Sequence, residues 1–270
     1  MLYLISTPIG NLKDITIRAL EILKECDYIL CEQIKHSLIL LNTYNIKKSL
    51  KPFYLFNEKQ REEEIIHDLR QGKKIALISN AGTPAICDPG ERLVQRCRHE
   101  SLPITALPGP SAWVTALSLS PFSKKKVQFL GFLPKKRGEK MVALASSAHV
   151  TTIFYESPHR LVSTLLAIPA KREVCVMKEL TKKFEQYYQG TAEELAYHFE
   201  INAPVKGEFV VLIKGEECDF SHLTTQEHLQ LIQQEYQLPL KEALKLVARL
   251  RNVAKKSLYS FRNGNRKKAS

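Results

Sequence analysis

Three loops that pair glycine with proline carry groups able to bind a small ligand. They are residues 7–11 (TPIGN), 80–90 (NAGTPAICDPG) and 108–112 (PGPSA), and each follows an apolar stretch typical of a strand. Glycine lets the backbone approach a ligand closely, and proline holds a turn in one shape. Backbone N–H and C=O groups with small hydroxyls, and few basic side chains, favour a nucleoside-type ligand over a polyphosphate.

The loops do not match the common nucleotide-binding signatures. The chain contains neither G-x-G-x-x-G nor a Walker sequence that ends in Lys-Ser or Lys-Thr. One such loop is weak evidence of a site, because an ordinary tight turn has the same composition. Three of them at successive strand ends predict one rigid cleft, since ligands of open parallel sheets bind beyond the carboxyl ends of the strands.

The elements that would hold these loops alternate between strand and helix. This order predicts an α/β fold whose first domain has a parallel sheet covered on both faces. Turn-bounded strands after residue 126 predict a mixed sheet in a second α/β domain. We expect domains at residues 1–119 and 120–217, then a small basic helical appendage at 218–270. The expected strands are residues 2–6, 28–31, 53–56, 74–79, 103–107, 127–132, 151–155, 173–177, 184–189 and 208–214.

Basic charge is concentrated at the end of the chain. The net charge is +12, and residues 237–270 hold ten Lys and Arg but one acidic residue, Glu242. A basic segment behind a near-neutral body indicates a polyanionic partner, with nucleic acid first. A solvated tail that only aids solubility is the alternative.

The cysteines indicate a reducing compartment. All six lie far apart without a C-x-x-C pair, and the N-terminus reads as a strand rather than a signal peptide. We therefore expect a cytoplasmic protein with buried thiols. No apolar stretch has membrane-spanning length. Neither cysteines nor histidines show zinc-ligand spacing, so we expect no zinc site.

Seven ordered motifs make the chain similar to a known family. Together they closely resemble the bacterial small-subunit ribosomal RNA (cytidine-2′-O)-methyltransferases of the tetrapyrrole-methylase superfamily. The likeness spans about residues 1–215, and the segment from Leu238 onward resembles that family's small C-terminal helical domain. The motifs are LYLISTPIGNLKDITIRAL, ISNAGTPAICDPG, LPGPSA, FLGFLPKKRGEK, TTIFYESPHRL, KELTKKFEQYYQGT and KGEFVVLIKG.

The resemblance implies a cofactor, a substrate and an assembly. It implies S-adenosylmethionine bound in a cleft between two α/β domains, no metal, a homodimer, and small-subunit ribosomal RNA as substrate. By position in the family pattern, residues from both domains line the donor site, although core packing is the alternative for the apolar ones. These residues are Ile9, Thr83, Ile86, Ser111, Ala112, Tyr155, Glu156, Gly207, Glu208 and Phe209.

Two departures from the family pattern concern charge. The family commonly has Asp at the position of Asn80, and Asp at the position of Gln33 in the segment that reads EQIKHS here. Asn80 can still accept a hydrogen bond, but it carries no charge near a sulfonium. The departures affect acid–base chemistry and RNA contact more than the fold, and they are compatible with reduced activity or a shifted substrate.

The reaction implied by the resemblance needs alignment and a base. An in-line displacement from a sulfonium requires the hydroxyl oxygen, the methyl carbon and the sulfur to be aligned, and a positioned base helps because a 2′-hydroxyl is a weak nucleophile. Glu156 is the preferred candidate because it follows a strand beside a proline-fixed turn, and a helix cap is its alternative role. The other candidates are Glu32, His36, His159 and Lys178.

Basic residues inside and beside the motifs are the candidate RNA contacts. An unpaired nucleotide in the assembled small subunit would offer a readable base, because the A-form major groove is too narrow for side chains. Solvated loops or helix packing are the alternatives for these positions. The candidates are Arg18, Lys35, Lys135, Lys136, Arg137 and Arg160, with Lys124, Lys125 and Lys126 as a further cluster.

Two other functions fit the same residues. A tetrapyrrole C-methyltransferase of the same superfamily would need a basic cleft but no basic tail. A ribosome-assembly factor that binds RNA without turnover would accommodate Asn80 and Gln33.

Overall fold

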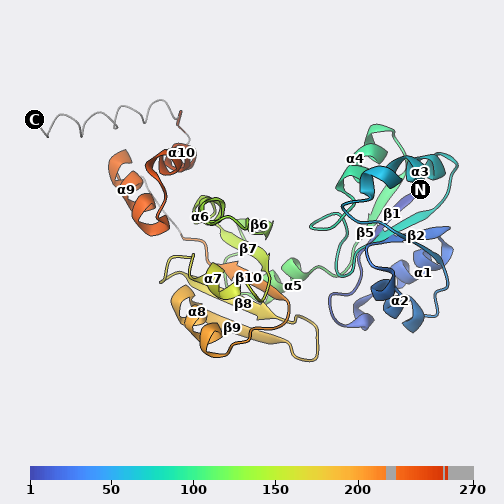
Figure 1. Ribbon diagram of the computed structural model, residues 1–270, viewed down its shortest axis with the longest axis horizontal. Coiled ribbons are helices and arrows are strands. Elements are labelled where there is room, and N and C mark those ends of the chain that lie inside the picture. The colour runs from blue at the N-terminus through green and yellow to red at the C-terminus, as the bar shows by residue number, and fades with distance from the viewer. Residues whose placement is uncertain (217–222, 252, 255–270) are drawn as a thin grey trace, which may run out of the picture. The chain divides into compact units, whose positions relative to one another are not determined.

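Short apolar strands and amphipathic helices build two units in this chain. The structure, a computed structural model, describes residues 1–216, 223–251 and 253–254 (Figure 1). Met1–Thr115 and Glu179–Glu185 form the first unit, and Ala116–Lys178 with the residues from Gln186 onward form the second. The domain boundaries expected after residues 119 and 217 stay predictions.

The first unit contains a five-stranded parallel sheet. Its strand order is β3-β2-β4-β1-β5, so β4 and β5 flank β1. Parallel strands place their carboxyl ends at one edge of the sheet, and the loops that follow them gather there. The strands are β1 (Leu2–Ile5), β2 (Tyr28–Cys31), β3 (Ser49–Pro52), β4 (Ile75–Ile78) and β5 (Ile104–Leu107).

Helices cover both faces of this sheet, as expected (Figure 1). Alternate residues of a strand point to opposite faces, so Ile5 packs with α1 and α2 while Leu2 packs with α3 and α4. Thr16 caps α1 by accepting a hydrogen bond from the Ala19 N–H at 3.1 Å. The helices are η1 (Leu12–Asp14), α1 (Ile17–Glu25), α2 (Ile34–Thr43), α3 (Glu58–Arg70) and α4 (Glu91–His99), and α5 (Ala112–Leu119) follows β5.

The second unit contains a mixed five-stranded sheet. The order is β6-β7-β10-β8-β9, in which β6 and β7 are parallel and the other neighbours are antiparallel. Helices pack on the face that carries Phe154 and Val211. The strands are β6 (Val127–Phe132), β7 (Thr151–Glu156), β8 (Glu173–Lys178), β9 (Gln186–Thr191) and β10 (Phe209–Ile213). The helices are α6 (Arg137–Ser146), α7 (Leu161–Leu165), α8 (Ala192–Ile201), α9 (Thr225–Tyr236) and α10 (Leu240–Leu250).

The last two helices share the core of the second unit. Ile232 of α9 and Leu244 and Val247 of α10 are buried in the same cluster as Met141 of α6. The basic pair Lys255–Lys256 and the rest of residues 255–270 lie outside the described residues.

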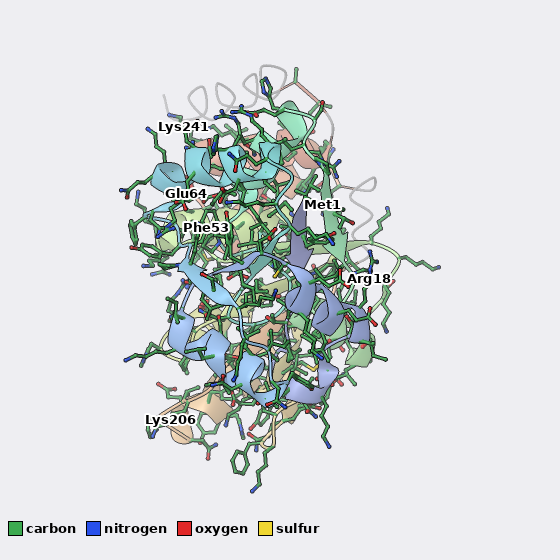
Figure 2. All side chains as sticks on the ribbon, turned by 90° about the vertical axis from the view of Figure 1, so that its right-hand side faces the viewer. Met1, Arg18, Phe53, Glu64, Lys206 and Lys241 are labelled. Atoms are coloured by element: carbon green, nitrogen blue, oxygen red, sulfur yellow. The ribbon has the colours of Figure 1, made fainter. Side chains whose placement is uncertain are left out.

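The predicted fold class is confirmed, and one predicted strand is wrong. A parallel and a mixed sheet are present as expected. However, the strand expected at residues 53–56 is a turn, and the third strand is Ser49–Pro52 instead. Phe53 is buried just after β3, whereas Leu55 and Phe56 are exposed (Figure 2 labels Phe53). The apolar run at residues 53–56 is typical of a strand, but only its first residue, Phe53, is buried in the core.

Candidate functional site

The three glycine–proline loops meet at the carboxyl edge of the first sheet. Residues 7–11 follow β1, residues 80–90 follow β4, and residues 108–112 follow β5. The first two loops form a short antiparallel bridge, since the Thr7 N–H donates to the Gly82 carbonyl at 2.8 Å and the Gly82 N–H donates to the Thr7 carbonyl at 2.9 Å. The edge is therefore a bonded unit rather than three separate turns.

Small hydroxyls tie the third loop to the other two. The Ser6 and Thr83 hydroxyl oxygens lie 2.9 Å apart and share a hydrogen bond. The Ser6 hydroxyl also lies 3.3 Å from the Leu107 carbonyl oxygen, and the Thr83 hydroxyl lies 3.3 Å from that of Pro110. These bonds join the ends of β1, β4 and β5, so the loops keep one arrangement before any ligand binds.

Two glycines are required by this arrangement. Gly82 has a φ of +78°, a conformation that L side chains rarely adopt. A Cβ on Gly109 would lie 2.8 Å from the Ser6 Cβ, which is too close for a real contact. Gly82 therefore allows a positive φ, and Gly109 allows close packing of the backbone against Ser6. Close approach of these loops to a ligand stays a prediction.

The structure places all five expected donor-site residues of the first unit in these loops or at the start of α5. Ile9 is buried, which also fits core packing, and Ile86 is 55% exposed. Thr83, Ser111 and Ala112 are half-buried. Their roles as donor contacts stay predictions, and the side chain of Thr83 also joins the loops through its hydroxyl group.

Two carboxyl groups lie next to this edge. The Asn80 Nδ2 donates to Glu32 Oε2 at 2.8 Å, which links the end of β4 to the end of β2. Burial and, to a smaller extent, the nearby Glu32 carboxylate raise the pKa of Asp88 to about 6, although a hydrogen bond with Ser79 lowers it in part. A carboxyl group with this pKa is a usable base near neutral pH.

Asp88 is a candidate base that lies outside the set predicted from the sequence. It lies in the second loop, but nothing local distinguishes it from an ordinary turn aspartate. Its altered pKa comes from burial and from Glu32, which is distant in sequence. Asn80 adds a further feature, because its Oδ1 is buried with no hydrogen-bond partner among the described residues.

A segment from the second half of the chain completes the edge. Residues 179–185 belong to the first unit, where the Thr181 hydroxyl accepts a hydrogen bond from the Asn11 N–H at 3.2 Å. A Cβ on Gly10 would lie 2.5 Å from the Lys182 Cγ. The motif KELTKK thus contacts the first loop, a contact that no sequence pattern indicated.

In the second unit, the remaining donor-site candidates gather at one end of two paired strands. Glu156 ends β7 and pairs in register with Phe209, which begins β10. Gly207 and Glu208 precede Phe209 directly, and Gly207 has a φ of +111°. Tyr155 faces away from Glu156 and contacts the rings of Phe129 and Phe132.

Glu156 lies in a buried polar cluster under the helices. Its Oε2 accepts from the Thr164 hydroxyl at 2.7 Å, its Oε1 accepts from the Ser157 N–H at 2.8 Å, and Arg160 Nε lies 3.3 Å from Oε1. Lys140 donates to the same Thr164 hydroxyl at 2.9 Å, and its pKa is lowered by burial. This geometry favours the alternative role, in which Glu156 holds the start of α7, over that of the base.

Replacing Glu156 with glutamine separates these two roles. Glutamine has one acceptor oxygen in place of two and no charge to pair with Arg160. We therefore expect the free energy of unfolding to fall by about 1–3 kcal/mol. Methyl transfer per folded molecule should stay within about twofold of wild type. Urea unfolding and single-turnover rates measure both; a large rate loss at unchanged stability would restore Glu156 as the base.

The candidate RNA contacts are spread over both units. In the first, Arg18 lies on α1 (Figure 2), and Lys35 and His36 lie in the exposed first turn of α2. In the second, Lys135, Lys136 and Arg137 are exposed at the start of α6, where Arg137 donates to Gln237 Oε1 at 3.1 Å.

Arg160 differs from the other basic candidates. Besides its pairing with Glu156, it donates to the Leu133 carbonyl at 2.8 Å. This position gives it a structural role in the second unit.

Helix α10 presents a basic stripe. Lys241, Lys245 and Arg249 are exposed at a spacing of four residues, while Leu244 and Val247 are buried. Side chains four apart lie on one face of a helix, so the three charges form one row. Part of the basic C-terminal segment is therefore an ordered surface on a packed helix.

Neither a metal cluster nor a membrane span occurs in the part of the chain that the structure describes. Within residues 1–216, 223–251 and 253–254, no three His, Cys, Asp or Glu side chains are grouped so that they could hold a metal ion. The helices over the same ranges are too short or too polar to cross a membrane.

Comparison with known proteins supplies a family and named relatives. Residues 1–196 match the family model described as Tetrapyrrole (Corrin/Porphyrin) Methylases. A ribosomal RNA small subunit methyltransferase I from Halalkalibacterium halodurans is 40% identical over 276 residues, which cover 96% of this chain and 93% of that protein. The protein of that name from Escherichia coli O157:H7 is 39% identical over 267 residues, covering 96% and 93%. The one from Thermotoga maritima is 43% identical over 220 residues, covering 80% and 99%.

Solved structures share the fold at low sequence identity. A cobalt precorrin-4 methyltransferase of cobalamin biosynthesis has a TM-score of 0.59 and 17% identity, covering 79% of this chain and 94% of that one. A uroporphyrin-III C-methyltransferase from Thermus thermophilus, complexed with S-adenosyl homocysteine, has a TM-score of 0.57 and 16% identity, covering 80% and 97%.

Proposed function

The chain belongs to the tetrapyrrole methylase family, and from that premise we propose that it methylates the ribose 2′-hydroxyl of a cytidine in small-subunit ribosomal RNA. The family expected from the ordered motifs is confirmed. The protein is a methyltransferase that uses S-adenosylmethionine, and its nearly full-length relatives are named for the small-subunit RNA. The observation that carries the proposal is the bonded edge of three loops in a chain with such relatives.

The residues of the first sheet's edge fit S-adenosylmethionine. Gly82 and Gly109 keep side-chain bulk out of the loops, so backbone groups can contact a nucleoside. The buried Asn80 Oδ1, which no residue in the described ranges hydrogen-bonds, could accept from an amino or hydroxyl group of the donor. Glu32 and Asp88 place negative charge near a ligand that carries a positive sulfonium. Ile9, Thr83, Ile86, Ser111 and Ala112 are the proposed contacts.

In the proposed mechanism, the protein aligns the reactants and removes a proton. S-adenosylmethionine, when bound, supplies a methyl group on a positively charged sulfur. The rigid loops would hold the donor, and limiting its orientations relative to the ribose hydroxyl would lower the entropic part of the barrier. Asp88, beside Glu32, would accept the proton of the ribose hydroxyl as its oxygen takes the methyl group and S-adenosyl homocysteine is released. Glu156 is not used as the base, because its carboxylate is held by Ser157, Thr164 and Arg160.

Basic surfaces supply the contacts to RNA phosphates. Arg18, Lys35 and His36 lie on exposed parts of the first unit, and Lys135–Arg137 lie on the second. The row Lys241, Lys245 and Arg249 on α10 adds three charges. Each phosphate that a protein neutralises releases counterions, so binding weakens as salt rises.

Neutralising the α10 row tests this surface without removing the helix. Deleting residues 237–270 would also remove the buried Leu244 and Val247, so the triple substitution of Lys241, Lys245 and Arg249 by glutamine is the cleaner change. We expect the slope of log K against log salt to become shallower by about 2–3. Filter binding of small subunits at several salt concentrations measures this slope.

The matched control is neutralisation of Lys124, Lys125 and Lys126, which are exposed outside the family motifs. If the slope of log K against log salt is unchanged in the α10 variant and shallower in the control, the phosphate contacts lie on the loop at residues 124–126 and not on α10.

The remaining partners follow from the substrate. We propose that the enzyme acts in the cytoplasm as a homodimer and on the assembled small subunit, where unpaired nucleotides of the folded RNA are accessible.

A methyl-transfer assay separates this function from the two alternatives. Tritiated S-adenosylmethionine is offered with small subunits, with free ribosomal RNA and with a tetrapyrrole. Label in the RNA supports the proposal, and label only in the tetrapyrrole assigns a C-methyltransferase. Binding of small subunits without label in any substrate assigns an assembly factor that lacks turnover.

A further inference from the structure

One buried carboxylate near the proposed site has an oxygen without a partner. Glu58, the first residue of α3, is 5% exposed, and its Oε1 has no hydrogen-bond partner among the described residues. Buried acceptors are nearly always paired, because an unpaired one has lost its water without replacement. Such an oxygen indicates a hydrogen-bond donor other than the residues that the structure describes.

The strand order places Glu58 beyond the carboxyl edge of the first sheet, on the side away from the donor loops. β3, which precedes Glu58, neighbours β2, and β2 neighbours β4. The Phe53 N–H donates to the Cys31 carbonyl at 2.8 Å, so the segments that contain β2 and β3 are still hydrogen-bonded to each other directly before Glu32. Strands lie about 4.8 Å apart, so β3 and β4 are separated by about 10 Å, roughly the length of one nucleoside.

An exposed aromatic ring precedes this carboxylate by two residues. Phe56 is 97% exposed at the tip of the turn between β3 and α3. Asn57 holds the turn, since its Oδ1 accepts from the Tyr54 N–H at 2.8 Å and its Nδ2 donates to the Pro52 carbonyl at 3.0 Å. The ring is therefore presented on a fixed turn, as in proteins that stack an unpaired base on an aromatic side chain.

We propose that Phe56 and Glu58 bind the base of the target nucleotide, with Phe56 stacking on it and Glu58 Oε1 accepting a hydrogen bond from its exocyclic amine. The inference rests on the proposed function and extends it to base selection. A carboxylate accepts from the N4 amino group of cytosine, while the O4 of uracil offers only a second acceptor. Adenine also has an exocyclic amine, so the chemistry requires an amino-bearing base, and the experiment below distinguishes the two.

The donor molecule is a weaker match for this oxygen. The bonded loops that fit S-adenosylmethionine follow β4, β1 and β5, whereas Glu58 follows β3 at the opposite side of the sheet. Glu32, at the end of β2, separates the two positions. The nucleotide side of the reaction is therefore the side on which Glu58 lies.

The test compares bases at the methylated position. Small subunits are reconstituted with RNA that carries C, U or A at the nucleotide labelled by the wild-type enzyme, and kcat/KM is measured for each. Wild type should prefer C strongly over U. In the Glu58→Gln variant the amide can donate to O4 of uracil, so we expect the C-to-U preference to fall about 10- to 100-fold.

Two controls keep a structural effect apart from base selection. Glu91→Gln removes the corresponding charge at the start of α4, where Glu91 is exposed, and should leave the C-to-U ratio unchanged. Phe56→Ala should raise KM about tenfold or more, Phe56→Trp should restore it, and Tyr197→Ala, at an exposed aromatic of α8, should have no effect.

Each outcome decides the inference separately from the proposed function. A reduced C-to-U ratio in Glu58→Gln, with wild-type unfolding, supports base binding by Glu58. An unchanged ratio overturns it while wild-type label in the RNA still supports the methyltransferase. If Glu58→Gln does not fold, the Phe56 pair decides: equal KM values for Phe56→Ala and wild type overturn the inference. Equal kcat/KM values for C and A would support recognition of the exocyclic amino group and overturn selection of cytosine over adenine.

Discussion

Replacing Asp88 with asparagine will lower the rate of methyl transfer about 10²- to 10⁴-fold and will make the folded protein more stable at neutral pH. The rate falls because asparagine cannot accept the proton of the attacking hydroxyl, and general bases contribute about this much. The stability rises because burial and the Glu32 carboxylate oppose the ionised form of Asp88 in the folded state.

The pH dependence of both effects follows from the sign of the shift. The pKa of Asp88 is raised from 3.8 to about 6, so between these two pH values the unfolded state ionises more readily than the folded state and the free energy of unfolding falls. Its contribution to stability is fully present below about pH 4 and is lost as the pH rises through 6. The variant should therefore gain about 1–2 kcal/mol at pH 7.5, after allowance for partial exposure, and nothing near pH 4.

Rate and stability profiles check this prediction together. Single-turnover rates of the wild type should rise with pH through about 6 and then level, whereas the variant should show no such rise. Urea unfolding at pH 4 and pH 7.5 gives the stability difference. If the rate of the variant depends on pH as that of the wild type does, Asp88 is not the base.

Replacing Gly109 with alanine will weaken donor binding about 10- to 100-fold. The new Cβ would lie 2.8 Å from the Ser6 Cβ, so Ser6 must move, and its hydroxyl bond to Thr83 is strained or broken. The loops after β1, β4 and β5 are joined through this bond. Overpacking of this kind also costs about 1–3 kcal/mol of stability.

Calorimetric titration with S-adenosyl homocysteine measures the affinity. Gly138→Ala is the matched control, because nothing lies within 4 Å of its Cβ, and alanine in α6 should preserve binding and slightly favour the helix. Wild-type affinity in Gly109→Ala would show that the donor does not depend on the joined loops.

The sequence predicted the loops well because their signals are local. Strands in an alternating β-α order must be parallel, and parallel strands put their following loops on one edge. The strand predicted at residues 53–56 is absent because Leu55 and Phe56 are apolar but exposed in a turn. Helix α8 was absent from the expectation although Thr191 and Glu194 form a readable capping box.

Other features depended on contacts between distant residues. The pKa of Asp88 depends on Glu32, and the buried state of Glu156 depends on Thr164 and Arg160. The return of residues 179–185 to the first unit is likewise set by packing against Gly10. No spacing rule indicates these contacts, because each joins elements that meet only after the chain has folded.

The chemical identity of the labelled nucleoside decides whether this protein is a cytidine 2′-O-methyltransferase. Small subunits labelled by the enzyme with tritiated S-adenosylmethionine are digested to nucleosides, which are separated and counted. We expect the tritium to elute as 2′-O-methylcytidine, with none on a base. Tritium on a base carbon or nitrogen, or on the ribose of another nucleoside, would contradict it.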